Sequence, residues 1–311
     1  MVHQDSALQT TLARPVELTG IGVHSGASVT ITIVPADADT GIRFQRTDGD
    51  VGPAVPAVWQ SVAATELCTM LAGADGRTIG TIEHLMAAFR GLGIDNALVE
   101  IDGPEMPIMD GSSSDFVEEL DLAGVYPLNQ RRRMIRVLKP VRVEINGSVA
   151  ELLPHDMPRF EIDIDFAGTI IGTQSMAFNL TPGVFRKELA RARTFGFLHE
   201  VEALWKMGYA RGSSLDNAVA IDGDRVLNFG GTRWSDEFVR HKALDAVGDL
   251  ALAGHAILGL YRSYKGGHRV NYQVVRQLMS DSSAYELVPA PAGAAPEYPA
   301  MVRELALDER V

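Results

Sequence analysis

Residues 238–268 read FVRHKALDAVGDLALAGHAILGLYRSYKGGH, and the rest of the chain can be understood as arranged around them. The apolar spacing predicts one helix that breaks at residues 265–268, where a glycine loop delivers His268. On such a helix His241 and Asp245 lie on one face, because they are four residues apart. Two possible metal ligands one turn apart are pre-oriented for a divalent cation. The alternative is a surface helix with an intrahelical His–Asp pair, and the rest of the sequence decides between them.

The composition is that of a soluble globular protein. Of the 311 residues, 46% are hydrophobic and 22% are charged, which allows a sizeable core. No apolar run approaches the roughly 18 residues of a membrane span, and no signal pattern opens the chain. A net charge of −12 argues against general nucleic-acid binding. The single cysteine, Cys68, rules out an internal disulfide and fits a reducing cytosol, so we expect a cytoplasmic protein. We also expect a monomer.

The sequence pattern indicates two similar α+β units in tandem. Strand-like segments followed by helices occur in residues 1–127 and again in residues 130–280. The clearest echo joins residues 26–35 to residues 147–154, since each is a strand that ends in proline. We therefore expect a duplicated fold, a β-α-α-β sandwich of two small sheets packed with helices, with the active site between the units. The alternative is two unrelated sheets that share common hairpin chemistry.

Individual elements follow from the same patterns. Residues 14–48 predict antiparallel strands, because β-branched residues alternate there before a proline. Residues 78–93 predict a helix that glycines end, and residues 181–193 predict another with proline in its first turn. An apolar, glycine-punctuated insertion occupies residues 194–221 of the second unit. Residues 281–311, rich in alanine and proline, are expected to form a mobile tail.

Each unit contributes residues to one chemical site. His84 from the first unit and His241 with Asp245 from the second make a set of two histidines and one carboxylate. That set suits catalytic zinc with water in an open fourth position, and it suits ferrous iron equally well. Glu83, next to a ligand, is a natural general base for the metal-activated water.

A second group of polar residues would supply a proton. His268 is a candidate general acid, and Asp249 would hold its imidazole and favour the protonated form. Lys242 would bring a positive charge to the same cleft. In contrast, Cys68 is interpreted as a small buried hydrophobic residue and His24 as a loop histidine whose hydrogen bonds are satisfied.

Seven ordered segments resemble the UDP-3-O-acyl-N-acetylglucosamine deacetylase family, the zinc amidohydrolases of lipid A biosynthesis. The resemblance covers nearly the whole chain, from about residue 14 to about residue 278. Each segment alone is modestly specific, whereas all of them in one order are very specific. The segments are residues 19–26, 81–85, 91–96, 107–112, 191–196, 238–249 and 265–268.

The resemblance implies a role for each matching residue. His84, His241 and Asp245 match the metal ligands. Glu83 matches the general base, His268 the general acid and Asp249 its carboxylate partner. Thr194 matches a threonine that hydrogen-bonds the developing oxyanion, and Lys242 matches a lysine in the substrate cleft. Phe195 matches a neighbouring residue that lines the cleft, and Lys265 matches a lysine on the diphosphate side of the substrate. Phe166 is a candidate for stacking on the uracil, with a core strand residue as the alternative.

The resemblance also implies a substrate. Metal-activated water would release acetate from UDP-3-O-(3-hydroxyacyl)-N-acetylglucosamine, the committed step of lipid A and lipopolysaccharide biosynthesis in Gram-negative bacteria. The implied cofactor is Zn²⁺, with Fe²⁺ as an alternative. The insertion would form a passage for the acyl chain, lined by Phe197, Leu198, Val201, Leu204, Leu215 and Ala218.

Two other functions stay open at this point. One is a metal-dependent deacetylase of a different acylated sugar nucleotide. The other is a metal-stabilised binding protein without turnover. Glu83 and His268 argue against the second alternative, since a structural metal site needs neither an acid nor a base and more often has four protein ligands.

Overall fold

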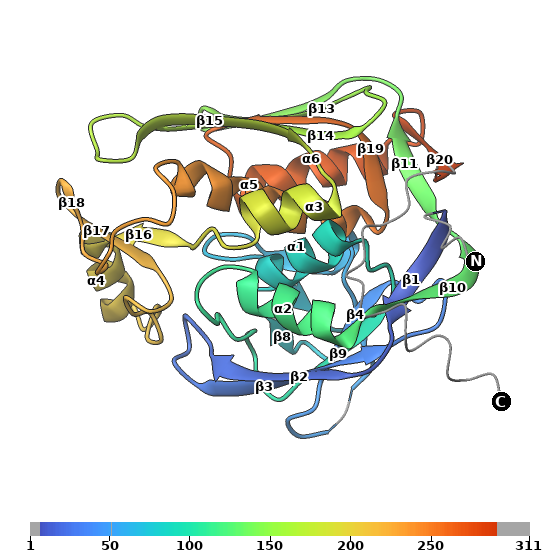
Figure 1. The fold of residues 1–311 in the computed structure, drawn as a ribbon, viewed down its shortest axis with the longest axis horizontal. Helices are drawn as coiled ribbons and strands as arrows, with labels where there is room; N and C mark the ends of the chain where they lie inside the picture. The colour runs from blue at the N-terminus through green and yellow to red at the C-terminus, as the bar shows by residue number, and fades with distance from the viewer. Residues whose placement is uncertain (1–6, 51, 291–311) are drawn as a thin grey trace.

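The fold is a layered α+β sandwich in which helices fill the space between two outer sheets (Figure 1). The computed structural model describes residues 7–50 and 52–290. The predicted α+β class with inner helices is therefore confirmed. No helix in the described residues is long and apolar enough to cross a membrane.

The first sheet has the strand order β2-β3-β9-β4-β5. Alternation buries one face of β3, where Val29, Ile31 and Ile33 point into the core. The prediction of antiparallel pairing throughout residues 14–48 was wrong for one pairing of the last strand, because β4 is antiparallel to β5 but parallel to β9. The strands are β2 (Val16–Ile21), β3 (Ser28–Pro35), β4 (Ile42–Arg46), β5 (Val55–Pro56) and β9 (Ala97–Ile101).

The second sheet has seven strands, and β19 pairs with three of them. It contains β11 (Arg133–Val137), β12 (Val141–Ile145), β13 (Ser148–Leu153), β14 (Pro158–Phe166), β15 (Gly172–Asn179), β19 (Ala256–Tyr264) and β20 (Tyr285–Pro289).

The prediction of a single helix in residues 238–268 was wrong. Helix α5 (Glu237–Leu250) and a short 3₁₀ turn, η3 (Ala251–Ala253), end at Gly254, whose φ of 85° is left-handed. The apolar run that follows is the buried strand β19, and periodicity alone does not distinguish such a strand from a buried helix. His268 is the first residue of helix α6 (His268–Ser280) rather than part of a loop.

The inner helices meet closely at the middle of the molecule. Helices α1 (Glu83–Leu92) and α2 (Ser114–Ala123) lie beside the first sheet, and α5 and α6 lie beside the second (Figure 1). Where α1 crosses α5, a methyl group at Gly248 would overlap the carbonyl oxygen of Glu83. The glycine thus lets the backbones approach, which brings the residues at the start of α1 next to α5.

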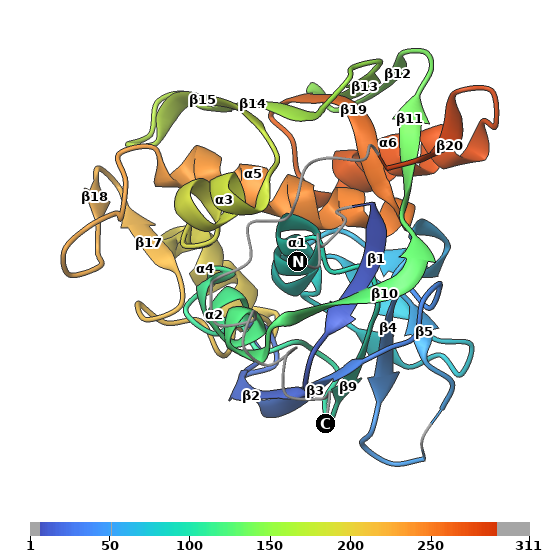
Figure 2. The same ribbon diagram turned by 45° about the vertical axis from the view of Figure 1, so that its right-hand side comes forward.

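The connection between the two halves is itself a strand pair. Strand β10 (Val125–Arg131) runs antiparallel to β1 (Leu8–Leu12), and Figure 2 shows the two side by side. The expected boundary at residues 127–130 therefore falls within a strand. Strand β20 pairs with β11, so the expectation of a mobile tail from residue 281 was wrong for residues 281–290. The rest of that predicted tail, residues 291–311, lies outside the described residues.

Smaller elements complete the described chain. The helix predicted at residues 181–193 is shorter, and its second part has π-helical geometry. It consists of α3 (Pro182–Val184) and η2 (Phe185–Leu189). The insertion forms a lobe of β16 (Phe195–Phe197), α4 (Leu198–Lys206), β17 (Val219–Asp222) and β18 (Arg225–Val226). A small sheet consists of β6 (Val62–Ala64), β7 (Met70–Ala72) and β8 (Thr78–Ile79), preceded by the 3₁₀ turn η1 (Trp59–Ser61).

Candidate active site

Two histidines and one aspartate converge where α1 meets α5. His84, His241 and Asp245 each offer a ligand atom, and these atoms lie within 4.8 Å of one another. Asp245 Oδ1 lies 3.4 Å from His241 Nε2 and 3.7 Å from His84 Nε2. Nδ1 of His241 donates to the carbonyl of Ala192 at 3.0 Å, which leaves the Nε2 lone pair free for a metal. Oδ1 of Asp245 is buried without a hydrogen-bond partner in the described chain, as expected of an oxygen that accepts a cation.

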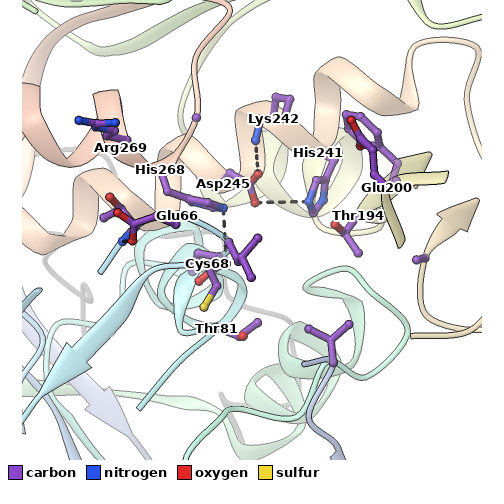
Figure 3. Close-up of a pocket in the computed structure, with 18 of the residues that line it drawn as sticks. Glu66, Cys68, Thr81, Thr194, Glu200, His241, Lys242, Asp245, His268 and Arg269 are labelled. Atoms are coloured by element: carbon purple, nitrogen blue, oxygen red, sulfur yellow. Dashed lines mark hydrogen bonds and ion pairs between the residues drawn. The ribbon is translucent and has the colours of Figure 1, made fainter. Parts of the chain in front are cut away.

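The protonation states of these residues also fit a metal. Burial, together with neighbouring His241, lowers the pKa of His84 to about 3, and burial lowers the pKa of His241. Burial alone would raise the pKa of Asp245, but His241 and Lys242 hold it well below its usual range. Nζ of Lys242 donates to Asp245 Oδ2 at 2.7 Å (Figure 3). Two neutral imidazoles and a carboxylate are the forms in which these side chains bind a divalent cation.

Glu83 begins helix α1, and its side chain is almost fully buried beside the ligand set. The backbone N–H of Thr69 donates to its Oε2 at 3.1 Å. Its Oε1 lies 3.6 Å from Nε2 of His268. Burial raises the pKa of Glu83 to about 7, a value suited to a general base near neutral pH.

His268 is held by a buried carboxylate. Its Nδ1 lies 2.8 Å from Oδ2 of Asp249, while its Nε2 faces Glu83. Burial alone would lower the pKa of His268, but the negative charges of Asp249 and Glu83 raise it to about 10. The imidazole is therefore cationic near neutral pH and can donate a proton from Nε2.

Three polar residues that sequence reasoning missed hold Asp249 in place. Thr69 Oγ1 donates to Asp249 Oδ1 at 2.6 Å, and Asn271 Nδ2 donates to Oδ2 at 2.8 Å. The hydroxyl of Tyr261 in turn donates to Asn271 Oδ1 at 2.6 Å, which fixes the orientation of the amide. Because Thr69 and Asn271 both donate to the carboxylate, Asp249 serves as an acceptor, and the proton stays on Nδ1 of His268.

Thr194 lines the same cleft as the ligand set. Its backbone N–H donates to the carbonyl of Gly111 at 2.7 Å, and its own carbonyl accepts from Val219 N at 2.7 Å. Within the described residues its hydroxyl makes no hydrogen bond, so it is available to a bound molecule. Figure 3 places Thr194 beside His241.

A group of aromatic rings forms the wall next to this threonine. The ring of Phe195 lies 5.0 Å from that of Phe238 and 6.2 Å from that of His241, both edge-on. Phe166 lies 5.7 Å from Phe195 and also lines the cleft, so its position agrees with both interpretations that the sequence left open.

Lys265 also lines the cleft, but it is already paired. Its Nζ lies 3.1 Å from Oδ2 of Asp165, which accepts from the Tyr264 hydroxyl as well. Lys242, in contrast, lies beside the ligand set itself. The two lysines therefore occupy different parts of one cleft.

The cleft has a volume of about 580 Å³ and reaches into the inserted lobe. Of the residues predicted to line an acyl passage, four line this cleft: Phe197, Val201, Leu204 and Ala218. Leu198 and Leu215 are not brought to this cleft, and Leu215 is 49% exposed. The helical pattern of the insertion did not reveal which side of α4 faces the cleft.

His24 and Cys68 also line the cleft. The prediction that His24 is satisfied was wrong, because its Nδ1 is buried without a hydrogen-bond partner in the described chain. Its loop is held by Glu105, which accepts from the backbone N–H of His24 at 2.8 Å and from Thr81 Oγ1 at 3.1 Å. Burial raises the pKa of Cys68 to about 12, as expected of an inert thiol.

Sequence comparison identifies the family. The sequence profile of the UDP-3-O-acyl N-acetylglycosamine deacetylase (LpxC) family matches residues 9–280, which is most of the chain. The chain belongs to the LpxC family. Proteins named UDP-3-O-acyl-N-acetylglucosamine deacetylase from Brucella ovis, Brucella canis and Brucella abortus are each 51% identical to it over 286 residues. The match covers 92% of this chain and 100% of each relative, so the LpxC resemblance extends over both.

Proposed function

We propose that this chain removes acetate from the N-acetyl group of UDP-3-O-(3-hydroxyacyl)-N-acetylglucosamine, the committed step of lipid A biosynthesis. The observation that carries the proposal is a buried set of two histidines and one carboxylate with Glu83 and His268 beside it. Family membership and the names of the Brucella relatives support the choice of substrate.

His84, His241 and Asp245 would hold the metal, and we infer zinc, with ferrous iron as the alternative. Support comes from the unpartnered Oδ1 of Asp245 and from the neutral imidazoles that face it. When bound, the cation would supply Lewis-acid chemistry that polarises the amide carbonyl and stabilises negative charge on its oxygen.

Glu83 would act as the general base. Glu83 lines the cleft with its Oε1 3.6 Å from Nε2 of His268, and its pKa of about 7 suits proton uptake from an attacking water. The backbone N–H of Thr69 occupies its other oxygen, so a single oxygen is presented to the reaction.

His268 would act as the general acid. An amide nitrogen leaves poorly unless it is protonated, and a cationic imidazole supplies that proton from Nε2. Asp249 stabilises the cation through Nδ1 at 2.8 Å. The hydroxyl of Thr194 would donate to the oxyanion that develops on the carbonyl oxygen, and Lys242 would add positive charge nearby.

The remaining cleft residues would bind the rest of the substrate. Val201, Leu204 and Ala218 would contact the acyl chain, and Phe195 would line the path toward them. Lys265 would exchange its pairing with Asp165 for the diphosphate. All these residues come from one chain, so the proposed enzyme needs no partner protein, and its unpaired cysteine is consistent with a cytoplasmic location.

The test is acetate release from UDP-3-O-(3-hydroxyacyl)-N-acetylglucosamine, measured on chelator-treated protein with and without added zinc. We expect turnover that depends on the metal. Binding of the substrate without acetate release, at full metal occupancy, would instead support the alternative of a metal-stabilised binding protein. Faster turnover of another acylated sugar nucleotide would identify a different substrate for the same site.

A further inference from the structure

A second cavity of about 540 Å³ lies at the other end of helices α1 and α5. The candidate active site uses the first residues of α1 and the middle of α5, whereas this cavity uses the last residues of both helices. Strands β11, β14 and β19 of the second sheet form the facing wall. Nothing in the proposed deacetylation uses this cavity.

The walls of the second cavity are mainly apolar. Each secondary-structure element that borders it supplies at least one aliphatic or aromatic side chain. The principal apolar lining residues are Leu92, Met134, Phe160, Val247, Leu250 and Leu258. Its volume is within the range of cavities that hold small molecules, which is roughly 300–1,000 Å³.

An unsatisfied cation borders these apolar walls. Arg90 is at the end of α1, and its Nε is buried without a hydrogen-bond partner. Across residues 7–50 and 52–290, the structure gives its guanidinium no hydrogen bond and no ion pair. A buried N–H donor without an acceptor is costly, and a bound anion could accept from it.

Within the described residues no charged group at this cavity forms a hydrogen bond or ion pair with Arg90, and burial lowers its pKa although the charge of Asp95 acts in the opposite direction. Asp95 is engaged by Arg132, whose Nε and a terminal nitrogen donate to it at 2.9 and 2.7 Å. Asp156 is exposed at the surface. His255 adds an imidazole near Arg90, and burial together with that cation lowers its pKa, so it contributes a neutral N–H donor.

We propose that the second cavity binds an anionic amphiphile, a linear alkyl chain with a carboxylate head. The carboxylate would accept from Arg90 and His255, and the alkyl chain would lie against the apolar walls. A planar guanidinium matches a carboxylate by forming two parallel hydrogen bonds. Because the lining combines apolar side chains with Arg90 and His255, a ligand that is only polar or only apolar would satisfy one part of it.

The first measurement is hydrogen exchange of the zinc-loaded full chain with hexadecanoate, hexadecanol or neither, at monomeric lipid concentrations. We expect hexadecanoate to slow exchange in the segments that border the second cavity, residues 90–93 and 247–258. Shorter carboxylates should bind more weakly, by about fourfold for each methylene removed. Hexadecanol, without the charge, should bind at least about tenfold more weakly than hexadecanoate.

The active-site cleft also accepts an acyl chain in the proposed reaction, so the two sites must be distinguished. Slower exchange confined to residues 195–221 would show binding in the cleft alone and would overturn the proposal. Arg90→Gln should remove the advantage of the acid over the alcohol at residues 247–258 and leave deacetylation unchanged. The matched control is Arg276→Gln, at an exposed arginine on α6. This variant should keep both the preference for hexadecanoate over hexadecanol and the rate of deacetylation. Unchanged hexadecanoate binding in Arg90→Gln would also overturn the proposal.

A stability measurement separates a ligand-binding role of Arg90 from a structural one. A residue kept for ligand binding is unsatisfied without its ligand, so ligand-free Arg90→Gln should melt about 2 °C higher than the parent. Hexadecanoate should then raise the melting temperature of the parent and not that of the variant. A lower melting temperature for ligand-free Arg90→Gln would mark Arg90 as a structural residue and overturn the proposal.

Discussion

At the residue scale, two neighbouring side chains hold opposite protonation states. Glu83 and His268 lie 3.6 Å apart, and their pKa values are about 7 and about 10. Each favours the charged form of the other, because a carboxylate stabilises an imidazolium and an imidazolium stabilises a carboxylate. Between the two values Glu83 is free to take a proton while His268 still has one to give.

The pH dependence of kcat/KM should therefore be bell-shaped. Activity should be lost as pH falls through the pKa of Glu83, because the base becomes protonated. It should also be lost as pH rises through the pKa of His268, because the acid loses its proton. A bound cation lowers both values, so the acid limb should lie below pH 7 and the alkaline limb below pH 10. A flat profile from pH 5 to pH 10 at constant zinc would contradict the assignment of both roles.

Removal of either group should reduce turnover without loss of metal. Glu83→Ala and His268→Ala are each expected to lower kcat by about 10²-fold or more, in line with general acid–base contributions. Metal content must be measured on the same samples by elemental analysis, because a lost cation would mimic a lost base. Parent-like turnover by a zinc-loaded Glu83→Ala protein would contradict the mechanism while leaving the metal site intact.

At the element scale, strand β19 and helix α6 together hold Asp249, the hydrogen-bond partner of the proposed general acid His268. Tyr261 is on β19 and Asn271 is on α6, one turn after His268, and both act on Asp249. Asn271→Ala should lower kcat by about tenfold with little change in KM, since it affects the orientation of His268 rather than substrate contacts.

A double-mutant cycle tests whether this effect passes through His268. In a protein that already has His268→Ala, Asn271→Ala should lower kcat almost no further, because the imidazole that Asn271 positions is absent. Tyr261→Phe should behave in the same way with a smaller effect, and Tyr285→Phe on β20 is the control. Fully additive losses would mean that Asn271 stabilises the fold without positioning the acid.

At the crossing of α1 and α5, replacing a glycine by alanine should destabilise the protein, although helix propensity alone would predict stabilisation. Gly248→Ala would stabilise an open helix by about 1 kcal/mol, but here the new methyl group meets the backbone of Glu83. We expect a loss of about 1–3 kcal/mol in the free energy of unfolding, measured with urea, together with weaker zinc binding. A more stable variant with unchanged zinc affinity would show that the helices do not need this close approach.

The sequence predicted which side chains meet at the cleft better than it predicted the elements that hold them. His241 and Asp245 are four residues apart on a helix, so their meeting follows from local geometry alone. Thr69 and Asp249 are 180 residues apart, and no local pattern predicts that contact. Likewise, the sequence predicted a helix where strand β19 lies, because an apolar strand buried in a sheet lacks an alternating pattern. Nothing in the sequence predicted that Arg90 has a buried nitrogen, since an arginine near a helix end normally faces solvent.

At the scale of the whole molecule, the metal would join the two halves. His84 comes from the half that carries the first sheet, whereas His241 and Asp245 come from the other half. A ligand that binds only the folded protein stabilises it, by about 4 kcal/mol when present at 1,000 times its dissociation constant. Chelation should therefore lower the melting temperature, and the difference should grow with zinc concentration in the parent. His84→Ala should remove that dependence, and a parent that melts equally with and without zinc would contradict the site.

Helix α5 also borders both the active-site cleft and the second cavity. Within 14 residues it contributes His241 and Asp245 to one and Val247 and Leu250 to the other. A molecule bound in either cavity would therefore contact the same helix. Occupancy of the two sites then forms one closed thermodynamic cycle. If an amphiphile at the far end changes the affinity of the near end for zinc by some factor, zinc must change the affinity for the amphiphile by the same factor.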